Sequence, residues 1–231
     1  VQLEKATATV GQSNINLGIS VLFLVGVLIF AFFQTTGVEG SAILIVAAII
    51  GGYMALNIGA NDVANNVGPA VGSKAITLVG ALIIAAVFEA AGAIIAGGDV
   101  VTTISKNIID PNVISDKSIF IWAMMAALLS AALWVNIATY VGAPVSTTHA
   151  VVGGVLGAGV AAAGLAAVNW PIMAKIAASW VISPVLGGVI AAAFLGFAKY
   201  FILYQEDKIT AARRWVPVLV AILASAFSVY L

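Results

Sequence analysis

Two acidic residues, Asp62 and Glu89, lie within or at the end of long apolar stretches of a 231-residue chain. A charge at the centre of a bilayer costs about 2.5–3.5 kcal/mol on insertion scales, so an acid there is expected to have a function or a partner. The nearest cation along the chain is Lys74. An unpaired buried carboxylate either takes up a proton or binds a cation. Both outcomes would be useful to a protein that moves cations.

The segment NIGANDVANNVGPAVGSKA, residues 57–75, surrounds Asp62 with amide side chains. We expect Gly59 to end the preceding helix, and Asn61 or Asp62 to cap a new one. The segment is therefore interpreted as a helix break. Its asparagines could serve an ion, or they could simply satisfy the backbone groups that the break exposes.

A cation site follows from the helix expected after this break. Asp62, Asn65 and Asn66 would share one of its faces, since side chains three and four positions apart are neighbours. Ligation by oxygen atoms alone suits a hard cation, as it does for calcium and magnesium. The spacing therefore predicts a sodium candidate at Asp62 and Asn65. Glu89 could complete this site, or it could be a protonated acid that is hydrogen-bonded between helices.

A second polar segment, GAPVSTTHAVVGG at residues 142–154, has the features of a helix start. Gly142 and Pro144 are expected to stop the preceding helix, because proline has no N–H group to donate. Hydroxyl side chains and His149 then precede a new apolar helix. Free N–H groups at a helix N-terminus attract anions, and transporters build anion sites from such half-helices. A plain serine or threonine cap outside the membrane is the alternative.

The composition indicates that these segments belong to a membrane protein. The chain is 63% hydrophobic and 8% charged, with a mean hydropathy of +1.17, whereas soluble domains are about half apolar and a quarter charged. The apolar stretches have the length of membrane-spanning helices. We interpret them as residues 17–33, 41–58, 75–97, 118–142, 150–168, 172–198 and 214–231. The chain is thus predicted to be an all-α polytopic protein of the cell membrane.

Charge and rare residues exclude several classes of protein. The formal net charge is zero, which gives no indication of a nucleic-acid partner. Cysteine is absent, which excludes disulfides, thiol catalysis and thiolate metal sites. His149 is the single histidine, and the sequence offers no convincing catalytic triad or metal set, so we predict neither an enzyme nor a bound cofactor.

Three segments organise the chain. Residues 1–40 are expected to form a tail and an extra helix, residues 41–198 a first transporter-like repeat, and residues 199–231 a connector with a further helix. Residues 199–214 hold four of the nine Lys and Arg residues, so the positive-inside rule predicts that this connector is cytoplasmic. Residues 98–117 are expected to form a loop that can carry a short helix, with a turn at Asp110-Pro111-Asn112.

Small residues crowd two of the spans. The stretches GGVLGAGVAAAG from Gly153 and GGVIAAAFLG from Gly187 would let helix backbones approach closely, which favours association in lipid. Both stretches are therefore predicted to be packing surfaces.

The quoted motifs resemble those of the inorganic phosphate transporter (PiT) family. GANDVANNVGPAVGSKA is similar to the family signature, and the same order of motifs continues with FEAAG at residues 88–92, TTISKNIID at 102–110 and APVSTTHAVVGGVLG at 143–157. The resemblance covers about residues 41–231. It implies import of inorganic phosphate by symport with sodium or protons, and a homodimer.

The resemblance also implies a fold of two inverted repeats, each with a re-entrant hairpin, here near residues 143–168. Combined with the spacing arguments, it gives two sets of site residues. The predicted cation-binding set is Asn61, Asp62, Asn65, Asn66 and Glu89. The predicted phosphate-binding set is Ser146, Thr147, Thr148 and His149, with hydroxyl groups that sodium could share.

One feature departs from the family pattern. GANDVAN occurs once, whereas the family carries a second copy of this motif in its other half. The chain is therefore expected to be one half of an inverted-repeat transporter, completed by a second repeat or a second chain. A symporter of another tetrahedral oxyanion such as sulfate, or a membrane subunit that does not transport, are the alternatives.

Overall fold

The computed structural model describes residues 2–102, 104, 107–110, 113–114 and 116–230. The regular elements of the described residues are helices. One isolated antiparallel bridge pairs Ile109 with Val168. The chain divides into two compact units, Val1–Asn169 and Trp170–Leu231. The boundaries predicted near residues 40 and 198 stay predictions.

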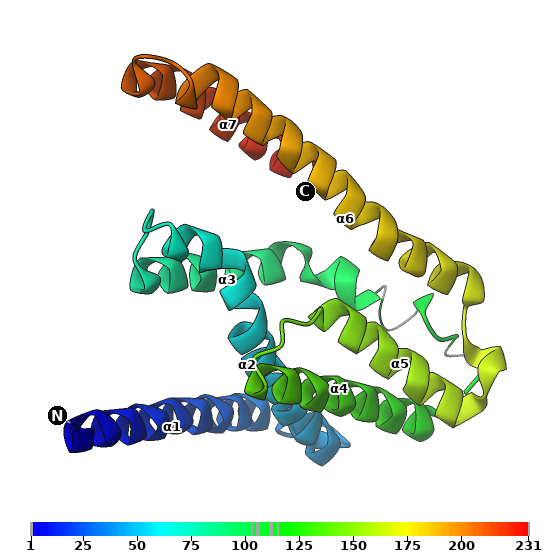
Figure 1. Ribbon diagram of the computed structural model, residues 1–231. Coiled ribbons are helices and arrows are strands. Elements are labelled where there is room, and N and C mark those ends of the chain that lie inside the picture. Colours follow the sequence, from blue (N-terminus) through cyan, green and yellow to red (C-terminus); the bar gives the residue numbers. More distant parts are fainter. Residues whose placement is uncertain (1, 103, 105–106, 111–112, 115, 231) are drawn as a thin grey trace. The chain divides into compact units, whose positions relative to one another are not determined.

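The described part of the first unit contains five α-helices, which Figure 1 labels along the chain. They are α1 (Gln2–Thr35), α2 (Ser41–Gly72), α3 (Leu78–Thr102), α4 (Lys117–Tyr140) and α5 (Thr147–Ala163). A short 3-10 helix, Leu165–Ala167, follows α5. Helix α4 packs against both α2 and α5, so these three helices form the centre of the unit.

The second unit is a helical hairpin. Helix α6 (Trp170–Ala198) continues into a π-helical turn, Lys199–Leu203, and α7 (Lys208–Tyr230) returns from it. The segment 199–214, predicted to be a polar connector, is therefore mostly helical, and the non-helical part is limited to residues 204–207. The Asp207 carboxylate explains the early start of α7, since it accepts from the N–H groups of Ile209 and Thr210 at 3.1 Å each and so caps the helix.

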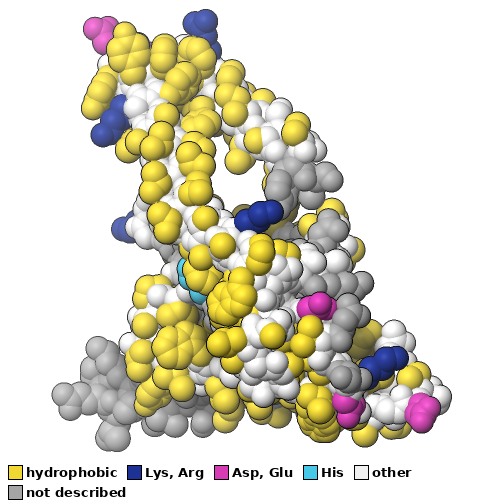
Figure 2. All heavy atoms as spheres, turned by 90° about the vertical axis from the view of Figure 1, so that its right-hand side faces the viewer, with side chains coloured by type: hydrophobic (Ala, Val, Ile, Leu, Met, Phe, Trp, Pro, Cys, Tyr) yellow, Lys and Arg dark blue, Asp and Glu magenta, His cyan; other side chains and the backbone are white. Residues whose placement is uncertain are grey.

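Six helices among the described residues are long and apolar enough to cross a membrane. They are Ile15–Thr35, Ser41–Gly72, Leu78–Gly98, Lys117–Tyr140, Trp170–Leu203 and Lys208–Val229. The 17-residue α5 is a shorter apolar helix. Figure 2 shows hydrophobic side chains over much of the visible face, with few charged ones between them. The prediction of an all-α, multi-pass membrane protein is confirmed.

The predicted helix break at Asp62 is wrong. Helix α2 runs without interruption from Ser41 to Gly72, so Gly59 and Asp62 both lie inside it. A glycine inside a helix costs only about 1 kcal/mol relative to alanine, which the packing of α2 on α4 can offset. The helix ends instead at Gly72, with Ser73 as its C-cap residue, and Lys74 follows in the left-handed conformation, with a φ of 61°.

The loop after α3 returns to the end of α5. Asp110 N–H donates to the Ala167 carbonyl at 2.9 Å, and Asn169 N–H donates to the Ile108 carbonyl at 3.0 Å. Ile108 and Ile109 are buried there. The expected turn has its Val113 N–H to Asp110 carbonyl hydrogen bond at 3.2 Å, while its central residues 111–112 lie outside the described part of the chain. The short helix expected within residues 98–117 falls partly on residues 103, 105–106 and 115, which also lie outside the described part of the chain.

Small residues let α5 approach its neighbours, as predicted for the stretch from Gly153. A Cβ atom at Gly154 would lie 2.6 Å from the Ala127 carbonyl oxygen, and one at Gly159 would overlap the Ile109 side chain. At Gly187 a Cβ atom would meet no described atom within 4 Å, so the packing role of that second stretch stays a prediction.

Candidate functional site

The two polar segments meet where the first turn of α5 touches the middle of α2. The Thr147 hydroxyl donates to Asp62 Oδ2 at 2.7 Å. Thr147 is 8% exposed, and Asp62 is half-buried. The contact joins residues 85 positions apart, so it brings the predicted cation and anion segments into one site.

The loop between α4 and α5 places Thr147 at this contact. Helix α4 ends at Tyr140, and Gly142 adopts a φ of +72°, a conformation that glycine reaches without steric cost. Ser146 then caps α5, and its side-chain oxygen accepts from the His149 N–H at 3.2 Å. The predicted helix stop at residues 142–144 and the predicted helix start after it are both confirmed.

Asn61 binds this loop to α2. Its side-chain amide donates to Thr139 Oγ1 at 3.0 Å and to the Ala143 carbonyl at 3.3 Å. Its amide oxygen accepts from the Val145 N–H at 3.3 Å. Asn61 is 7% exposed. Both ends of its amide are therefore engaged with the polypeptide, which fixes the loop beside Asp62.

A pair of amide side chains, Asn57 and Asn136, lies about one helical turn from Asn61 and was not predicted from the sequence. Asn136 donates its side-chain N–H to Asn57 Oδ1 at 2.8 Å, and Asn57 donates to the Tyr53 carbonyl at 2.8 Å. Asn57 is 4% exposed. A signal was present, because an asparagine at position 136 stands in an apolar stretch and the argument used for Asp62 applies to it. This pair fixes the register of α2 on α4.

Replacing Asn136 with leucine is expected to destabilise the protein by about 0.6 kcal/mol, and by at most ~1.7, the range measured for hydrogen bonds between membrane helices. The buried Asn57 oxygen would lose its donor. The double variant Asn57→Leu, Asn136→Leu should regain part of this loss, because it leaves no amide unpaired. Thermal unfolding in detergent measures both. A double variant no more stable than the sum of the single changes would contradict the pairing.

Of the other predicted cation ligands, Asn65 lines a hollow beside Asn61, whereas Asn66 and Glu89 are exposed. Asn65 lines a hollow of about 390 Å³ together with Asn61, Thr139 and the 142–144 loop. Asn66 is exposed on α2. Glu89 is exposed on α3, so within the described residues it is not part of the Asp62 contact.

The predicted phosphate ligands divide between two directions. Thr147 turns toward Asp62. Ser146 and His149 line a separate hollow of about 540 Å³ between α4 and α5, where Trp134 also lies. Thr148 is exposed. Successive residues of a helix point about 100° apart, so four consecutive side chains cannot all face one ligand.

The charge at this site is balanced by the end of a helix. Asp62 faces the first residue of α5, and the positive N-terminal end of a helix stabilises a negative charge nearby. The site therefore pairs an acid with a hydroxyl and a helix end inside a membrane-length bundle, an arrangement suited to binding ions.

Comparison with known proteins gives a consistent result. The model of the phosphate transporter family matches residues 58–231. Two relatives carry the name "Putative phosphate permease": one from Helicobacter pylori strain J99 is 54% identical over all of this chain, and one from Pyrococcus abyssi is 46% identical over 76% of it. This chain spans 43% of the length of each.

A solved structure is similar to most of this chain. The protein described as "The sodium-dependent phosphate transporter" superposes with a TM-score of 0.71 and is 40% identical. The match covers 74% of this chain and 42% of that protein.

Proposed function

Because the chain belongs to the phosphate transporter family, we propose that it forms part of a secondary transporter that imports inorganic phosphate together with sodium. The relatives named as phosphate permeases support the substrate. The solved relative, described as sodium-dependent, supports the coupling ion. Protons are the alternative coupling ion.

We further propose that this chain supplies one half of the transport unit. The match with this chain covers less than half the length of each relative. The other half would be a second repeat or a second chain, and the complete unit would form a homodimer within the lipid bilayer. The other half would complete the site beside Asp62, where Asn65 and Asn66 are exposed in this chain.

The contact between Asp62 and Thr147 is the observation that carries the cation site. An ionised carboxylate can only accept, so the Thr147 hydrogen points at Asp62 and the oxygen of Thr147 keeps lone pairs for a ligand. Sodium would therefore bind beside the Asp62 carboxylate, with Thr147 Oγ1 and the Asn65 amide oxygen as further ligands. Asn61 would act as a positioning residue, since its amide already holds the loop.

Ser146 has the opposite hydrogen-bonding state, which favours the anion. Its oxygen accepts from the His149 N–H, so its own hydrogen remains available to donate. A phosphate at the start of α5 would receive this donor, with Thr148 and His149 near it on the exposed side of the helix. Sodium on the Asp62 side would offset part of the negative charge.

Electrostatics explains why the two ions should move together. Bringing a dianion into a cell against an inside-negative potential costs about 4.6 kcal/mol per 100 mV, at about 2.3 kcal/mol per charge. Two or more co-transported sodium ions would offset this cost. A site that holds a carboxylate next to an anion-binding helix end provides the coupling.

Uptake of labelled phosphate into proteoliposomes tests the proposal. The complete transporter should take up phosphate only with an inward sodium gradient, and this chain alone should not. Sulfate in excess should not compete, because phosphate can donate a hydrogen bond to an acceptor beside it near neutral pH and sulfate cannot. Uptake that depends on neither a sodium nor a proton gradient would contradict symport. Full competition by sulfate would show that the transporter does not select phosphate over other tetrahedral oxyanions.

Replacing Thr147 with valine is expected to raise the sodium concentration for half-maximal uptake by roughly tenfold or more. The change removes a hydroxyl bound to a charged group, an interaction that contributes about 1.5–3 kcal/mol. The control variant Thr147→Ser keeps the hydroxyl and should stay close to the unmodified protein. If the valine variant keeps its sodium dependence and binds phosphate more weakly, Thr147 is a ligand of the anion and not of sodium.

A further inference from the structure

The turn end of the second unit carries an unusual concentration of positive charge. Lys199, Lys208, Arg213 and Arg214 are four of the nine Lys and Arg residues of the chain. They surround the point where α6 passes into α7, and Figure 2 shows Lys and Arg side chains standing out at this end of the hairpin. The turn joins two helices that are long and apolar enough to cross a membrane, so it is expected at the level of the lipid headgroups.

Aromatic rings hold this end of the hairpin together. Trp215 of α7 packs against Phe197 and Phe201 of the other limb, with ring centroids 5.1 Å apart in each pair. The Arg214 guanidinium carbon lies 5.5 Å from the centre of the Trp215 ring. A guanidinium placed over an aromatic face is held by cation–π attraction while its N–H groups stay free at the edge.

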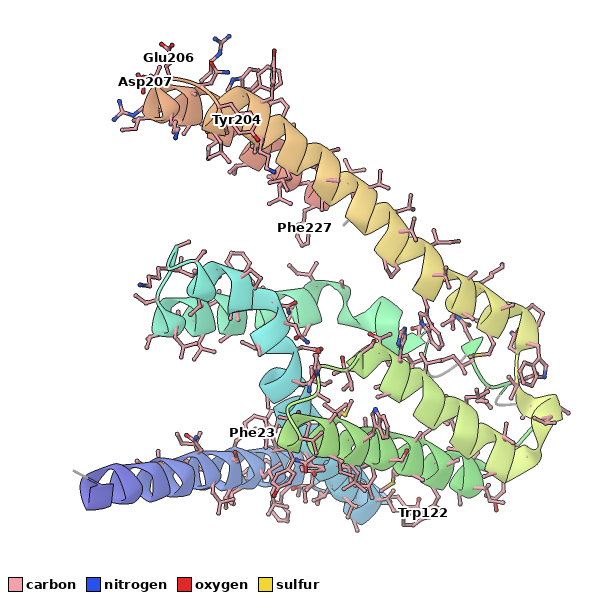
Figure 3. All side chains as sticks on the ribbon, in the orientation of Figure 1. Phe23, Trp122, Tyr204, Glu206, Asp207 and Phe227 are labelled. Atoms are coloured by element: carbon pink, nitrogen blue, oxygen red, sulfur yellow. The ribbon has the colours of Figure 1, made fainter. Side chains whose placement is uncertain are left out.

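A hollow of about 760 Å³ opens beside Arg214. Its lining includes the rings of Phe201, Tyr204 and Trp215, and also the two acids of the turn, Glu206 and Asp207. Tyr204 is 74% exposed, and Figure 3 shows it at the turn end of α6. The hollow thus sets aromatic rings beside the Arg214 guanidinium, whereas the Thr210 hydroxyl there already donates to the turn. Aromatic rings beside a guanidinium suit a molecule with acyl chains and an anionic head.

The two acids of the turn line the same hollow and offset part of this positive charge. The Asp207 carboxylate is engaged with the start of α7, where it also accepts from Thr210 Oγ1 at 2.6 Å. Asp207 accepts hydrogen bonds from the Thr210 hydroxyl and from the N–H groups of Thr210 and Ile209, and these hold the pKa of its carboxyl below the ordinary value. Glu206 and Asp207 project from the tip of the turn (Figure 3). Four cations against two acids leave this end positively charged.

We propose that the turn between α6 and α7 is a binding site for the headgroup of an anionic phospholipid. Arg214 would bind the lipid phosphate through two N–H groups, because its planar fork matches phosphate geometry. Lys208 and Arg213 would add attraction to the negative surface of the membrane. Trp215 and Tyr204 would contact the region between headgroup and acyl chain, where aromatic residues are enriched. The site is distinct from the Asp62 contact and does not depend on transport.

Native mass spectrometry of the purified full chain tests the site, with phosphatidylglycerol and phosphatidylcholine of identical acyl chains as probes. The unmodified protein should retain phosphatidylglycerol in preference to phosphatidylcholine. The triple variant Lys208→Gln, Arg213→Gln, Arg214→Gln should lose this preference, by about fivefold for each cation removed. The matched control is Lys175→Gln, an exposed lysine near the other end of α6, and it should retain the preference.

Further variants separate the effect of charge and the effect of side-chain shape from a loss of folding. Arg213→Lys with Arg214→Lys keeps the charge and should bind more weakly than the unmodified protein but better than the triple variant. If the triple variant loses helix content by circular dichroism, Arg214→Lys and Arg214→Gln are compared alone. Equal retention of the two lipids, or an unchanged preference in a folded triple variant, would overturn the proposal. Displacement of the lipid by millimolar inorganic phosphate would also overturn it, since the site would then bind free phosphate.

Discussion

Replacing Asp62 with asparagine is expected to abolish sodium-dependent phosphate uptake while the protein still inserts into the membrane. The amide oxygen can still accept from Thr147, so the contact between α2 and α5 should persist. What is lost is the negative charge that attracts the cation. An interaction with a charged group contributes about 1.5–3 kcal/mol, so uptake should fall by at least about tenfold at limiting sodium. Initial rates of uptake as a function of sodium concentration measure the effect.

Asp116→Asn is the matched control for this experiment. Asp116 caps α4, where its carboxylate accepts from the Ser118 N–H at 2.7 Å. Asparagine caps helices as well as aspartate does, so the same chemical change there should leave uptake intact. If the Asp62 variant keeps its sodium dependence, the cation site lies elsewhere in the transporter.

Replacing Gly154 with alanine is expected to separate α4 from α5 and to destabilise the protein by about 1–3 kcal/mol, the usual cost of overpacking. The added Cβ atom would lie 2.6 Å from the Ala127 carbonyl oxygen and 3.3 Å from Ser130 Oγ. A backbone oxygen cannot turn aside as a flexible side chain can, so one helix must move. Since α5 also carries Thr147, the shift should reduce uptake as well. Thermal unfolding in detergent and uptake rates measure the two effects.

The neighbouring glycine provides the control. A Cβ atom at Gly153 would meet nothing within 4 Å, and alanine is favoured over glycine in a helix by up to about 1 kcal/mol. Gly153→Ala should therefore leave the protein unchanged or slightly more stable. Similar unfolding temperatures for the two alanine variants would show that α4 and α5 do not pack as closely as the structure describes.

Much of the site could be predicted because its elements are local. Gly142 and Pro144 indicate where one helix stops, and Ser146 indicates where the next begins, since these residue types act on the backbone beside them. The cost of a carboxylate in an apolar helix singles out Asp62 in the same way. The wrong expectation was also local: Gly59 was interpreted as a helix end, although the contacts of α2 with α4 keep the helix continuous.

The contacts between helices could not be read from the sequence. Asn57 and Asn136 are 79 positions apart, and Asn61 and Thr139 are 78 apart. Each is an ordinary polar residue in an apolar stretch until its partner is known. Their pairing depends on the register of α2 on α4, which small changes in packing at Met54 and Val135 would alter.

The sequence by itself determined that this protein is a multi-pass helical membrane protein with two polar segments, because hydropathy, helix caps and the cost of intramembrane charge depend on residue type and near neighbours. Only the tertiary structure decided how those segments divide their tasks. It joined Thr147 to Asp62, turned Ser146 and His149 to another face, and used Asn61 to hold the loop. The physical reason is that a hydroxyl or amide group can serve a ligand only with the hydrogen-bonding capacity its neighbours leave free, and those neighbours lie on other helices.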